Sequence, residues 1–513
     1  MTITSQTSGS SKGAKLEVRS PLNGELLATL PIHTQDDVNA AVTRARRAAE
    51  VWGALSFKER RAHLLDYRRE LVRRMDEIID IVHRENGKTA TDAAQELLLV
   101  LNHLTHAANR AEALLKTRSV SSGVLANYRS RVSYHPYGVI GVIGPWNYPL
   151  HTPMGSISYA LAAGNAVVFK PSELTPLCGK ILVECAQAAI PIPDLVQLVT
   201  GYGDVGAALA RSKVDKVAFT GSAPTGRKVM AEAAQNLTPI LLELGGKGPA
   251  IVAADADLDR AAASIVFGAF MNSGQACIST ERALVVDSVY DAFVTKVVEL
   301  ARTLKVGSDE HAHYGAMTLD RQVDRVREHV TEALDKGARA VFGGLDSIKG
   351  RFIEPIVLAD VSPKLKVMCE ETFGPVLPIA KVSSVEEAVR IANDTAFGLG
   401  SSVFTKHGGE QLADRLITGM TSINAVAAYA AIPGLPFGGV RESGFGRIHG
   451  DEGMLEFVRV KATTYERFPL PGFGMAFGDP QKALAQTRQT IKALYAGSAL
   501  DGVGNVLRKL KGG

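Results

Sequence analysis

Apolar residues recur at three- and four-residue spacing from Thr34 to about Asn86, which is the pattern of a buried helix face. Thr34, with two aspartates close behind it, is typical of a helix start, and a further helical run extends from Ser56 to Arg84. We expect these helices to pack on a sheet and to carry no chemistry.

From about Tyr134 the pattern changes, because short apolar runs of strand length alternate with helical stretches. A second alternating series begins near Glu243 and continues to about Ala427. Such alternation predicts an α/β fold, with parallel sheets covered by helices on both faces. The strands expected are 138–143, 166–169, 195–199 and 217–219 in the first series and 250–252, 282–286, 341–342, 356–358 and 376–379 in the second, and the helices expected in the first series include 154–163 and 225–234.

Two extended segments fall outside both series. Residues 118–136 alternate as in a β-ribbon, and residues 462–468 predict one further strand. We expect these two segments to form an interface module.

Length and composition narrow the class of protein. At 513 residues the chain is long enough for two or three domains. Its 46% hydrophobic and 21% charged residues are ordinary for a soluble globular protein. The net charge of +4 comes without a Lys/Arg block, so we expect no nucleic-acid partner.

The chain ends differ in composition from the rest. The Ser-, Thr- and Gly-rich residues 1–13 predict disorder and lack the apolar core of a secretory signal. No apolar stretch of the sequence reaches the roughly 18 residues that span a bilayer, and we expect a cytoplasmic protein. After a linker that begins at Pro469, residues 479–513 form a basic amphipathic tail. We expect this tail to pack on its own protein, and weak peripheral contact with an acidic membrane surface is the alternative.

The four cysteines are too few and too scattered for a disulfide framework. None lies in a Cys-x-x-Cys pair or beside a histidine at metal-ligand spacing, so we expect no metal site. Free thiols agree with a reducing cytoplasm. The usual cysteine is a small buried apolar residue, and we expect this of Cys178, Cys185 and Cys369.

Cys277 and Glu243 have unusual local sequences. Small and polar residues surround Cys277 over 273–279, which favours an open loop accessible to a ligand. Glu243 ends an apolar strand that Gly245 and Gly246 stop at once. It is either a salt-bridged residue at a strand end or a general base whose pKa is raised by apolar surroundings. A Cys–His hydrolase stays open in principle, although no histidine lies in a comparably glycine-rich setting.

Two glycine-rich turns are candidates for holding a nucleotide. Gly201, Gly203 and Gly206 have Gly-x-Gly-x-x-Gly spacing after a strand, but the acidic residue expected about 20 positions later is missing. We assign these three glycines to a tight turn and a helix start. The better candidate is 219–226, where a strand leads directly into a helix whose first N–H groups can bind a phosphate.

Seven motifs together resemble those of the aldehyde dehydrogenase superfamily, in that family's order and at its spacing, over roughly residues 18–467. Any one of them could arise by chance, whereas the ordered set is specific. The motifs lie at 145–150, 170–173, 219–222, 243–247, 274–277, 371–375 and 436–439.

The resemblance implies roles for three residues. Cys277 would be the nucleophile that attacks the aldehyde carbon, and the carboxamide of Asn147 with the backbone N–H of Cys277 would hold the oxyanion. Hydride transfer to the nicotinamide would leave a thioester, and Glu243 would activate the water that hydrolyses it. The implied reaction is the oxidation of an aldehyde to the carboxylic acid.

The resemblance also implies the contacts with the cofactor. Lys170 and Glu173 would reach the adenosine ribose hydroxyls, and because the Glu173 carboxylate would repel a 2′-phosphate, we expect NAD rather than NADP. The other cofactor residues implied are Gly221 and Ser222 near the pyrophosphate, Glu371 and Phe373 at the nicotinamide ribose and ring, and Trp146.

The implied fold has a Rossmann-like cofactor domain, an α/β catalytic domain and a small β oligomerisation module, within a homodimer or homotetramer. The expected boundaries are 1–117 and 138–243 for the NAD-binding domain, 244–440 for the catalytic domain, 118–137 and 441–470 for the oligomerisation segments, and 471–513 for the C-terminal amphipathic extension.

The substrate is expected to be an apolar aldehyde, aliphatic or aromatic. The presumed tunnel residues Tyr148, Thr152 and Gly155 are uncharged, and the loop 425–436 contains no Arg or Lys that could pair with a carboxylate. A substrate of the succinic-semialdehyde type is the alternative. Two other functions stay open: transfer of the acyl group to coenzyme A, against which Glu243 argues, and a catalytically silent binding protein, against which the presence of all three catalytic residue types argues.

Overall fold

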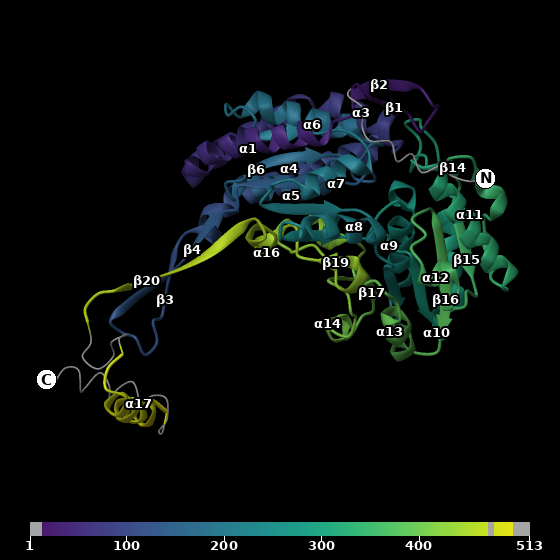
Figure 1. The fold of residues 1–513 in the computed structure, drawn as a ribbon. Coiled ribbons are helices and arrows are strands. Elements are labelled where there is room, and N and C mark those ends of the chain that lie inside the picture. Colours follow the sequence, from purple (N-terminus) through teal and green to yellow (C-terminus); the bar gives the residue numbers. More distant parts are fainter. Residues whose placement is uncertain (1–12, 470–476, 496–513) are drawn as a thin grey trace. The chain divides into compact units, whose positions relative to one another are not determined.

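The structure, a computed structural model, describes residues 13–469 and 477–495. These residues form two compact units, one of residues 13–115 and 135–459 and the other of residues 116–134 and those from Val460 onward. The first unit contains two large sheets, of six and seven strands, and the three-stranded sheet lies mainly in the second unit. The fold is therefore α/β, as predicted (Figure 1).

The predicted N-terminal helices are confirmed as α1 (Gln35–Ala54), α2 (Phe57–Arg73) and α3 (Met75–Asn86). Thr34 and Ser56 begin the first two helices through capping boxes, in which each side chain accepts from the N–H of the third helical residue and that residue's carboxylate bonds back. Three elements of the N-terminal part were not predicted. They are the hairpin of β1 (Lys15–Arg19) and β2 (Leu26–Pro31) and the long helix α4 (Ala90–Leu115).

The six-stranded sheet has the order β19-β9-β8-β5-β6-β7. Five of its strands are parallel, and β19 (Gly444–Phe445) pairs antiparallel with β9. The central strands are buried along their whole length, which explains why they are continuous apolar runs in the sequence. The parallel strands are β5 (Val139–Ile143), β6 (Ala166–Lys170), β7 (Val196–Leu198), β8 (Lys216–Thr220) and β9 (Ile240–Glu243), and the helices between or beside them are α5 (His151–Ala162), α6 (Pro176–Ala189), α7 (Gly203–Arg211) and α8 (Ala223–Ala234).

The seven-stranded sheet has the order β12-β15-β16-β11-β10-β17-β18. Alternate residues of its strands enter two separate apolar clusters, one with α9 (Leu258–Phe270) and α10 (Asp287–Ala301), the other with α11 (Asp320–Asp335) and α13 (Val385–Asn393). Both faces are therefore covered by helices. The strands are β10 (Pro249–Val252), β11 (Arg282–Val286), β12 (Arg339–Phe342), β15 (Ile356–Ala359), β16 (Val376–Val382), β17 (Gly400–Phe404) and β18 (Met420–Ile423).

The three-stranded sheet joins β3 (Arg118–Val120), β4 (Tyr128–Pro136) and β20 (Val458–Glu466), in agreement with the predicted ribbon and additional strand. The segment expected to accompany this sheet from residue 441 begins later, because residues 441–459 belong to the first unit. There β19 pairs with β9, and α16 (Gly450–Leu455) contacts α5.

Part of the predicted amphipathic tail is the helix α17 (Pro480–Tyr495), which buries none of its residues. The rest of the tail, the linker after Pro469 and the N-terminal residues 1–12 lie outside the described residues. Within the residues that are described, no helix is long and apolar enough to cross a membrane.

A buried ion pair ties α4 to the turn that follows β5. Lys88 Nζ lies 2.7 Å from Glu96 Oε2, and both side chains are inaccessible to solvent. The second carboxylate oxygen of Glu96 accepts from the N–H groups of Leu150 and His151, at 2.7 and 2.9 Å. Lys88 also donates to the carbonyl of Asn147, at 2.9 Å. Since the pair has all these partners, it fixes the backbone of residues 147–151.

We predict that Lys88→Met lowers the free energy of unfolding by about 3–5 kcal/mol, because Glu96 would remain buried without its cation. Urea unfolding monitored by tryptophan fluorescence measures the loss. The matched control is Lys336→Met, since the Lys336 side chain is exposed in its ion pair with Glu332 and a pair at the surface is worth less than about 1 kcal/mol. Equal losses in the two variants would contradict the prediction.

Candidate functional site

Three of the predicted site residues lie at the carboxyl ends of parallel strands of the six-stranded sheet. Lys170 ends β6, Glu243 ends β9, and Gly221 follows β8 directly. Thr220 and Glu243 are register partners, and Gly221 N–H donates to the Glu243 carbonyl at 3.0 Å. In α/β sheets this edge is where ligands bind. The topology thus brings together residues that lie far apart in the sequence.

Glu243 is buried without a hydrogen-bond partner. Its residue is 2% exposed, and neither carboxylate oxygen has a partner among the described side chains and backbone groups. Burial raises the pKa of Glu243 well above its usual range, and the opposing effect of the Arg447 charge is smaller. A buried polar group without a partner is costly, and such groups are concentrated at functional sites.

A glycine leaves the space around this carboxylate. A Cβ on Gly438 would lie 2.7 Å from Glu243 Oε1. Gly438 belongs to the motif at 436–439. The glycine therefore allows the 436–439 backbone to approach the carboxylate closely.

Cys277 follows a tight turn after α9. Asn272, Ser273 and Gly274 all have positive φ, of 50°, 59° and 69°. A Cβ on Gly274 would lie 2.2 Å from the carbonyl oxygen of Gly374, so only glycine fits there. Hydrogen bonds hold the turn: Ser273 Oγ donates to the Gly315 carbonyl at 2.8 Å, and Gln275 Oε1 accepts from Thr318 N–H at 2.9 Å. Cys277 is thus presented from a fixed backbone.

The four cysteines differ in exposure. Cys277 has intermediate exposure, whereas Cys178 and Cys185 are buried, as predicted. The expectation for Cys369 is wrong: this residue is exposed, and its thiol donates to the Pro363 carbonyl at 3.1 Å. Cys369 is the last residue of the short helix α12 (Lys366–Cys369).

Burial raises the pKa of the Cys277 thiol to about 12, with smaller contributions from the negative charges of Glu243 and Glu371. The backbone N–H groups of Cys277 and Ile278 act in the opposite direction but are weaker. The thiol is therefore protonated at neutral pH in this structure. Its attack on a substrate requires a proton acceptor, and Glu243 is close enough to affect its titration.

The carboxamide of Asn147 is fixed beside the Cys277 loop. Asn147 Nδ2 donates to the carbonyl of Gln275 at 2.9 Å, and Asn272 Nδ2 donates to the carbonyls of Asn147 and Gln275, at 3.0 and 3.2 Å. A carboxamide nitrogen carries two hydrogens. One is used in the bond to Gln275, which leaves the second as a donor next to Cys277.

The predicted cofactor residues Lys170 and Glu173 lie together. Lys170 is buried, donates to the Pro171 carbonyl at 2.9 Å and approaches Glu173 Oε2 to 4.0 Å. The Glu173 side chain is 39% exposed, so one member of the pair is open to a ligand. A Cβ on Gly206 would lie 3.5 Å from Lys170 Cδ, so the start of α7 borders this pair.

The turns at 201–206 and 219–226 have the predicted conformations. Gly201 has φ 146°, and α7 begins at Gly203, so the first glycine group makes a tight turn and a helix start. At α8 the N-cap residue Ser222 makes no side-chain capping bond, so its side chain does not occupy the N–H donors of the first turn. Gly221 is needed because a Cβ would lie 2.6 Å from the Phe219 ring.

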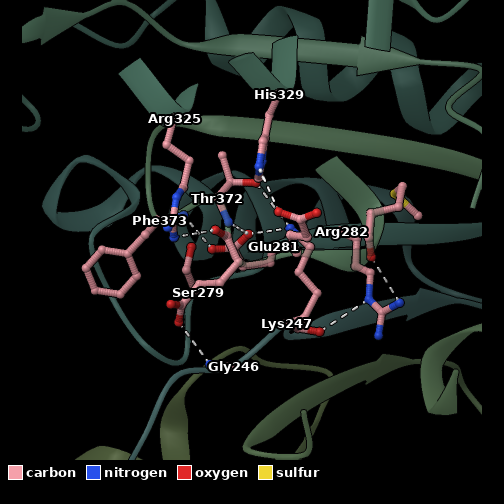
Figure 2. A network of polar contacts seen from close by, with 12 residues as sticks. Gly246, Lys247, Ser279, Glu281, Arg282, Arg325, His329, Thr372 and Phe373 are labelled. Carbon is pink, nitrogen blue, oxygen red and sulfur yellow. Dashed lines mark hydrogen bonds and ion pairs between the residues drawn. The ribbon is translucent and has the colours of Figure 1, made fainter. Parts of the chain in front are cut away.

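A buried polar network holds Thr372 and Phe373 (Figure 2). The carboxylate of Glu281 accepts from the N–H groups of Thr372 and Phe373, at 3.0 and 2.9 Å, and pairs with Lys247 Nζ at 2.5 Å. Glu371 accepts from Gly246 N–H at 2.9 Å, and burial raises its pKa to about 7. The network therefore attaches the loop 371–373 to the motif that follows Glu243.

Lys247 and Glu281 were not predicted to position the loop 371–373. Lys247 lies in the motif at 243–247, which was a usable signal, but nothing in the sequence around Glu281 connects it to residue 372. The Phe373 and Trp146 rings meet edge to face, with centroids 5.5 Å apart. Trp146 is thus placed beside the loop that carries Phe373.

The presumed tunnel residues lie on the turn after β5 and on the first turns of α5. The ring of Tyr148 lies 4.2 Å from Lys88 Nζ, and Thr152 is half-buried. Gly155 faces His449, since a Cβ there would lie 2.7 Å from His449 Nε2. In the apolar loop, Tyr429 is buried, and the charge of a Cys277 thiolate would reach it.

Comparison with known proteins agrees with this arrangement. The pattern of the aldehyde dehydrogenase family matches residues 7–463. The chain is 42% identical to 4,4'-diapolycopene aldehyde oxidase of Methylomonas sp, over 88% of this chain and 86% of the relative. It is 35% identical to a putative NADP(+) succinate-semialdehyde dehydrogenase of Mycobacterium bovis, over 92% and 93%. The crystal structure of an NAD-dependent aldehyde dehydrogenase from Sinorhizobium meliloti superimposes with a TM-score of 0.85 at 35% identity, over 90% and 93% of the two chains.

The family match covers nearly the whole chain. The alignments with the relatives and with the solved structure also include most of both chains. The chain belongs to the aldehyde dehydrogenase family.

Proposed function

We propose that this protein oxidises an apolar aldehyde to the carboxylic acid with NAD, and that Cys277, Asn147 and Glu243 carry the chemistry. The observation that supports this most directly is the buried, unpartnered carboxylate of Glu243, whose negative charge raises the pKa of the Cys277 thiol. The site combines a nucleophile, a neutral donor and a base within a buried setting.

In the first step the ionised form of Glu243 takes the thiol proton of Cys277, and Cys277 Sγ attacks the carbonyl carbon. The second hydrogen of Asn147 Nδ2 and the backbone N–H of Cys277 stabilise the oxyanion that develops. One such donor contributes about 2.7–4 kcal/mol to transition-state stabilisation. A bound nicotinamide would supply the hydride acceptor, and loss of the hydride from the former aldehyde carbon would leave an acyl thioester on Cys277.

In the second step Glu243, after releasing its first proton to solvent, takes a proton from a water molecule. The hydroxide adds to the thioester, the C–S bond breaks, and the acid leaves as Cys277 recovers its proton. Because burial raises the pKa of Glu243, its basic form increases as the pH rises. We therefore expect thioester hydrolysis to accelerate with pH.

The cofactor residues suit a dinucleotide. The first turn of α8 offers N–H donors and the positive end of a helix dipole to a pyrophosphate. The Lys170–Glu173 pair can bond the ribose hydroxyls, and the carboxylate of Glu173 disfavours a 2′-phosphate. We infer a preference for NAD, and NADP is the alternative because one relative is named for it.

We infer that the three-stranded sheet mediates a homodimer or homotetramer. In β20 every residue after Val458 is exposed, which leaves an extended strand without cover on the described chain. Long exposed strands are usually covered in assemblies.

We predict that Cys277→Ala abolishes NADH formation with hexanal and benzaldehyde, because the nucleophile is lost. NAD binding, measured by isothermal titration calorimetry, should stay within a few-fold of wild type. The control is Cys369→Ala, which removes an exposed thiol outside the site and should retain activity. NADH formation by Cys277→Ala near the wild-type rate would exclude the assignment of the nucleophile.

We predict that Glu243→Gln lowers steady-state turnover by about 100-fold or more, since general-base catalysis contributes about 10²–10⁴-fold. Hydride transfer should be affected less. Stopped-flow absorbance should therefore show a burst of one NADH per active site before a slow phase. A variant that turns over near the wild-type rate, or that loses the burst and the slow phase equally, contradicts this role.

We predict that hexanal and benzaldehyde have higher kcat/KM than succinic semialdehyde, because the loop 425–436 provides no cation for a carboxylate. The same panel is assayed with NAD and with NADP, and with coenzyme A added to test for acyl-CoA. A large preference for succinic semialdehyde would overturn the apolar assignment. Formation of acyl-CoA would show that the acyl group is transferred to coenzyme A and that the thioester is not hydrolysed.

A further inference from the structure

Three histidines from distant parts of the sequence meet in the interior of the first unit. His103 lies on α4, His151 is the first residue of α5, and His449 precedes α16. They are 0%, 8% and 0% exposed. One ring nitrogen from each lies within 4.8 Å of those of the other two.

Most of the ring nitrogens in this cluster have no hydrogen-bond partner. His103 Nε2 lies 3.0 Å from the carbonyl oxygen of Ala430, which can only accept, so Nε2 carries the proton and the lone pair of Nδ1 is available. Within the described part of the chain, His103 Nδ1, His151 Nε2 and both nitrogens of His449 lack partners. Each buried polar group without a partner lowers the stability of the fold by about 1–3 kcal/mol. A ligand bound by these nitrogens would remove that cost.

The interior position of the three histidines favours their neutral form. Burial lowers the pKa of His103 to about 3 and that of His151 to about 4, and it lowers the pKa of His449 well below the usual range. Metals bind the neutral imidazole. A histidine ligand also typically donates its other N–H to a carbonyl, as His103 does to Ala430.

We propose that His103, His151 and His449 form a binding site for one divalent transition-metal cation of the Zn²⁺ type. Three imidazoles are a known ligand set for zinc, with a fourth position left for water or another ligand. The ring centroids of His103 and His151 are 5.1 Å apart and those of His151 and His449 5.3 Å, which is compatible with two rings pointing at one ion.

The rings of His103 and His449 must change their relative orientation when a metal ion binds. The His103 and His449 rings are 3.7 Å apart between centroids and nearly overlie one another. Tetrahedral ligand nitrogens about 2.0–2.1 Å from zinc lie roughly 3.4 Å apart. The ring of His449 makes no hydrogen bond among the described residues, so it can turn toward a shared ion without breaking one.

The proposed site adjoins the residues expected to guide the substrate. Gly155 faces His449, and His151 belongs to the same backbone segment as Asn147, which Lys88 and Glu96 fix. A cation there would stabilise this segment. The cysteine spacing in the sequence predicted no metal, but it could not report on histidines brought together by three separate helix ends and faces.

Metal content tests the proposal directly on the full chain, produced without a histidine tag. The protein is treated with a chelator, exposed to Zn²⁺, dialysed and analysed by plasma mass spectrometry. We expect one Zn²⁺ per chain, a higher thermal midpoint with Zn²⁺ than without it, and visible absorption bands of a nitrogen-ligated ion after Co²⁺ substitution. Absence of bound Zn²⁺ in the folded wild-type protein would overturn the proposal.

Variants identify the ligands. His449→Leu and His151→Leu should each weaken Zn²⁺ binding by more than the about 10–100-fold that loss of an outer partner costs. Circular dichroism of the metal-free proteins shows whether they fold. The matched control is His106→Leu, which lies on α4 one turn from His103, has an unpartnered buried Nε2 and is outside the proposed ligand set. If folded His449→Leu binds Zn²⁺ as wild type does, the proposal is wrong.

Discussion

The burial of the Glu243 carboxylate without a hydrogen-bond partner is the constraint on which the rest of the site depends. Folding alone gives no reason to place an unpaired carboxylate at the end of an apolar strand, since the cost of its desolvation opposes stability. The same burial makes this group a strong base once it ionises. Burial of the Cys277 thiol likewise raises its pKa, and the negative charge of Glu243 adds to this rise.

The surrounding backbone is fixed and does not move to give the Glu243 carboxylate a hydrogen-bond partner. Two buried lysine–glutamate pairs fix the backbone on either side: Lys88–Glu96 holds the turn that carries Asn147, and Lys247–Glu281 holds the loop that carries Phe373. Buried pairs of this kind add little net stability, but each is costly to break. Glycines at 221, 274 and 438 then allow backbone segments to approach where any side chain would clash.

Much of this fold could be predicted from the sequence. Strands with both faces covered are continuous apolar runs, and the capping residues Thr34 and Ser56 mark helix starts, so local pattern was sufficient there. The site residues were predicted from the ordered set of motifs. The motifs identify the positions of these residues but not the contacts that hold them. The pairing of β19 with β9 could not be predicted, because a two-residue strand is too short to produce a periodic signal.

What the sequence could not provide depends on partners far apart in the chain. Glu281 has no local feature that connects it to residue 372, and no spacing rule joins His103, His151 and His449. The exposure of Cys369 was not predicted either, because only the general tendency of cysteine to be buried was available from the sequence. These properties arise only when the topology brings the segments together.

The ionisation of Glu243 in the folded protein is the most direct measurement of the central claim. Infrared difference spectra between wild type and Glu243→Gln, recorded as a function of pH without ligands, isolate the carboxyl band of this residue. The account predicts a protonated carboxyl that persists well above the ordinary glutamate pKa of about 4.3. A band that is fully ionised at about pH 5 to 6, as expected for an ordinary glutamate, would contradict it.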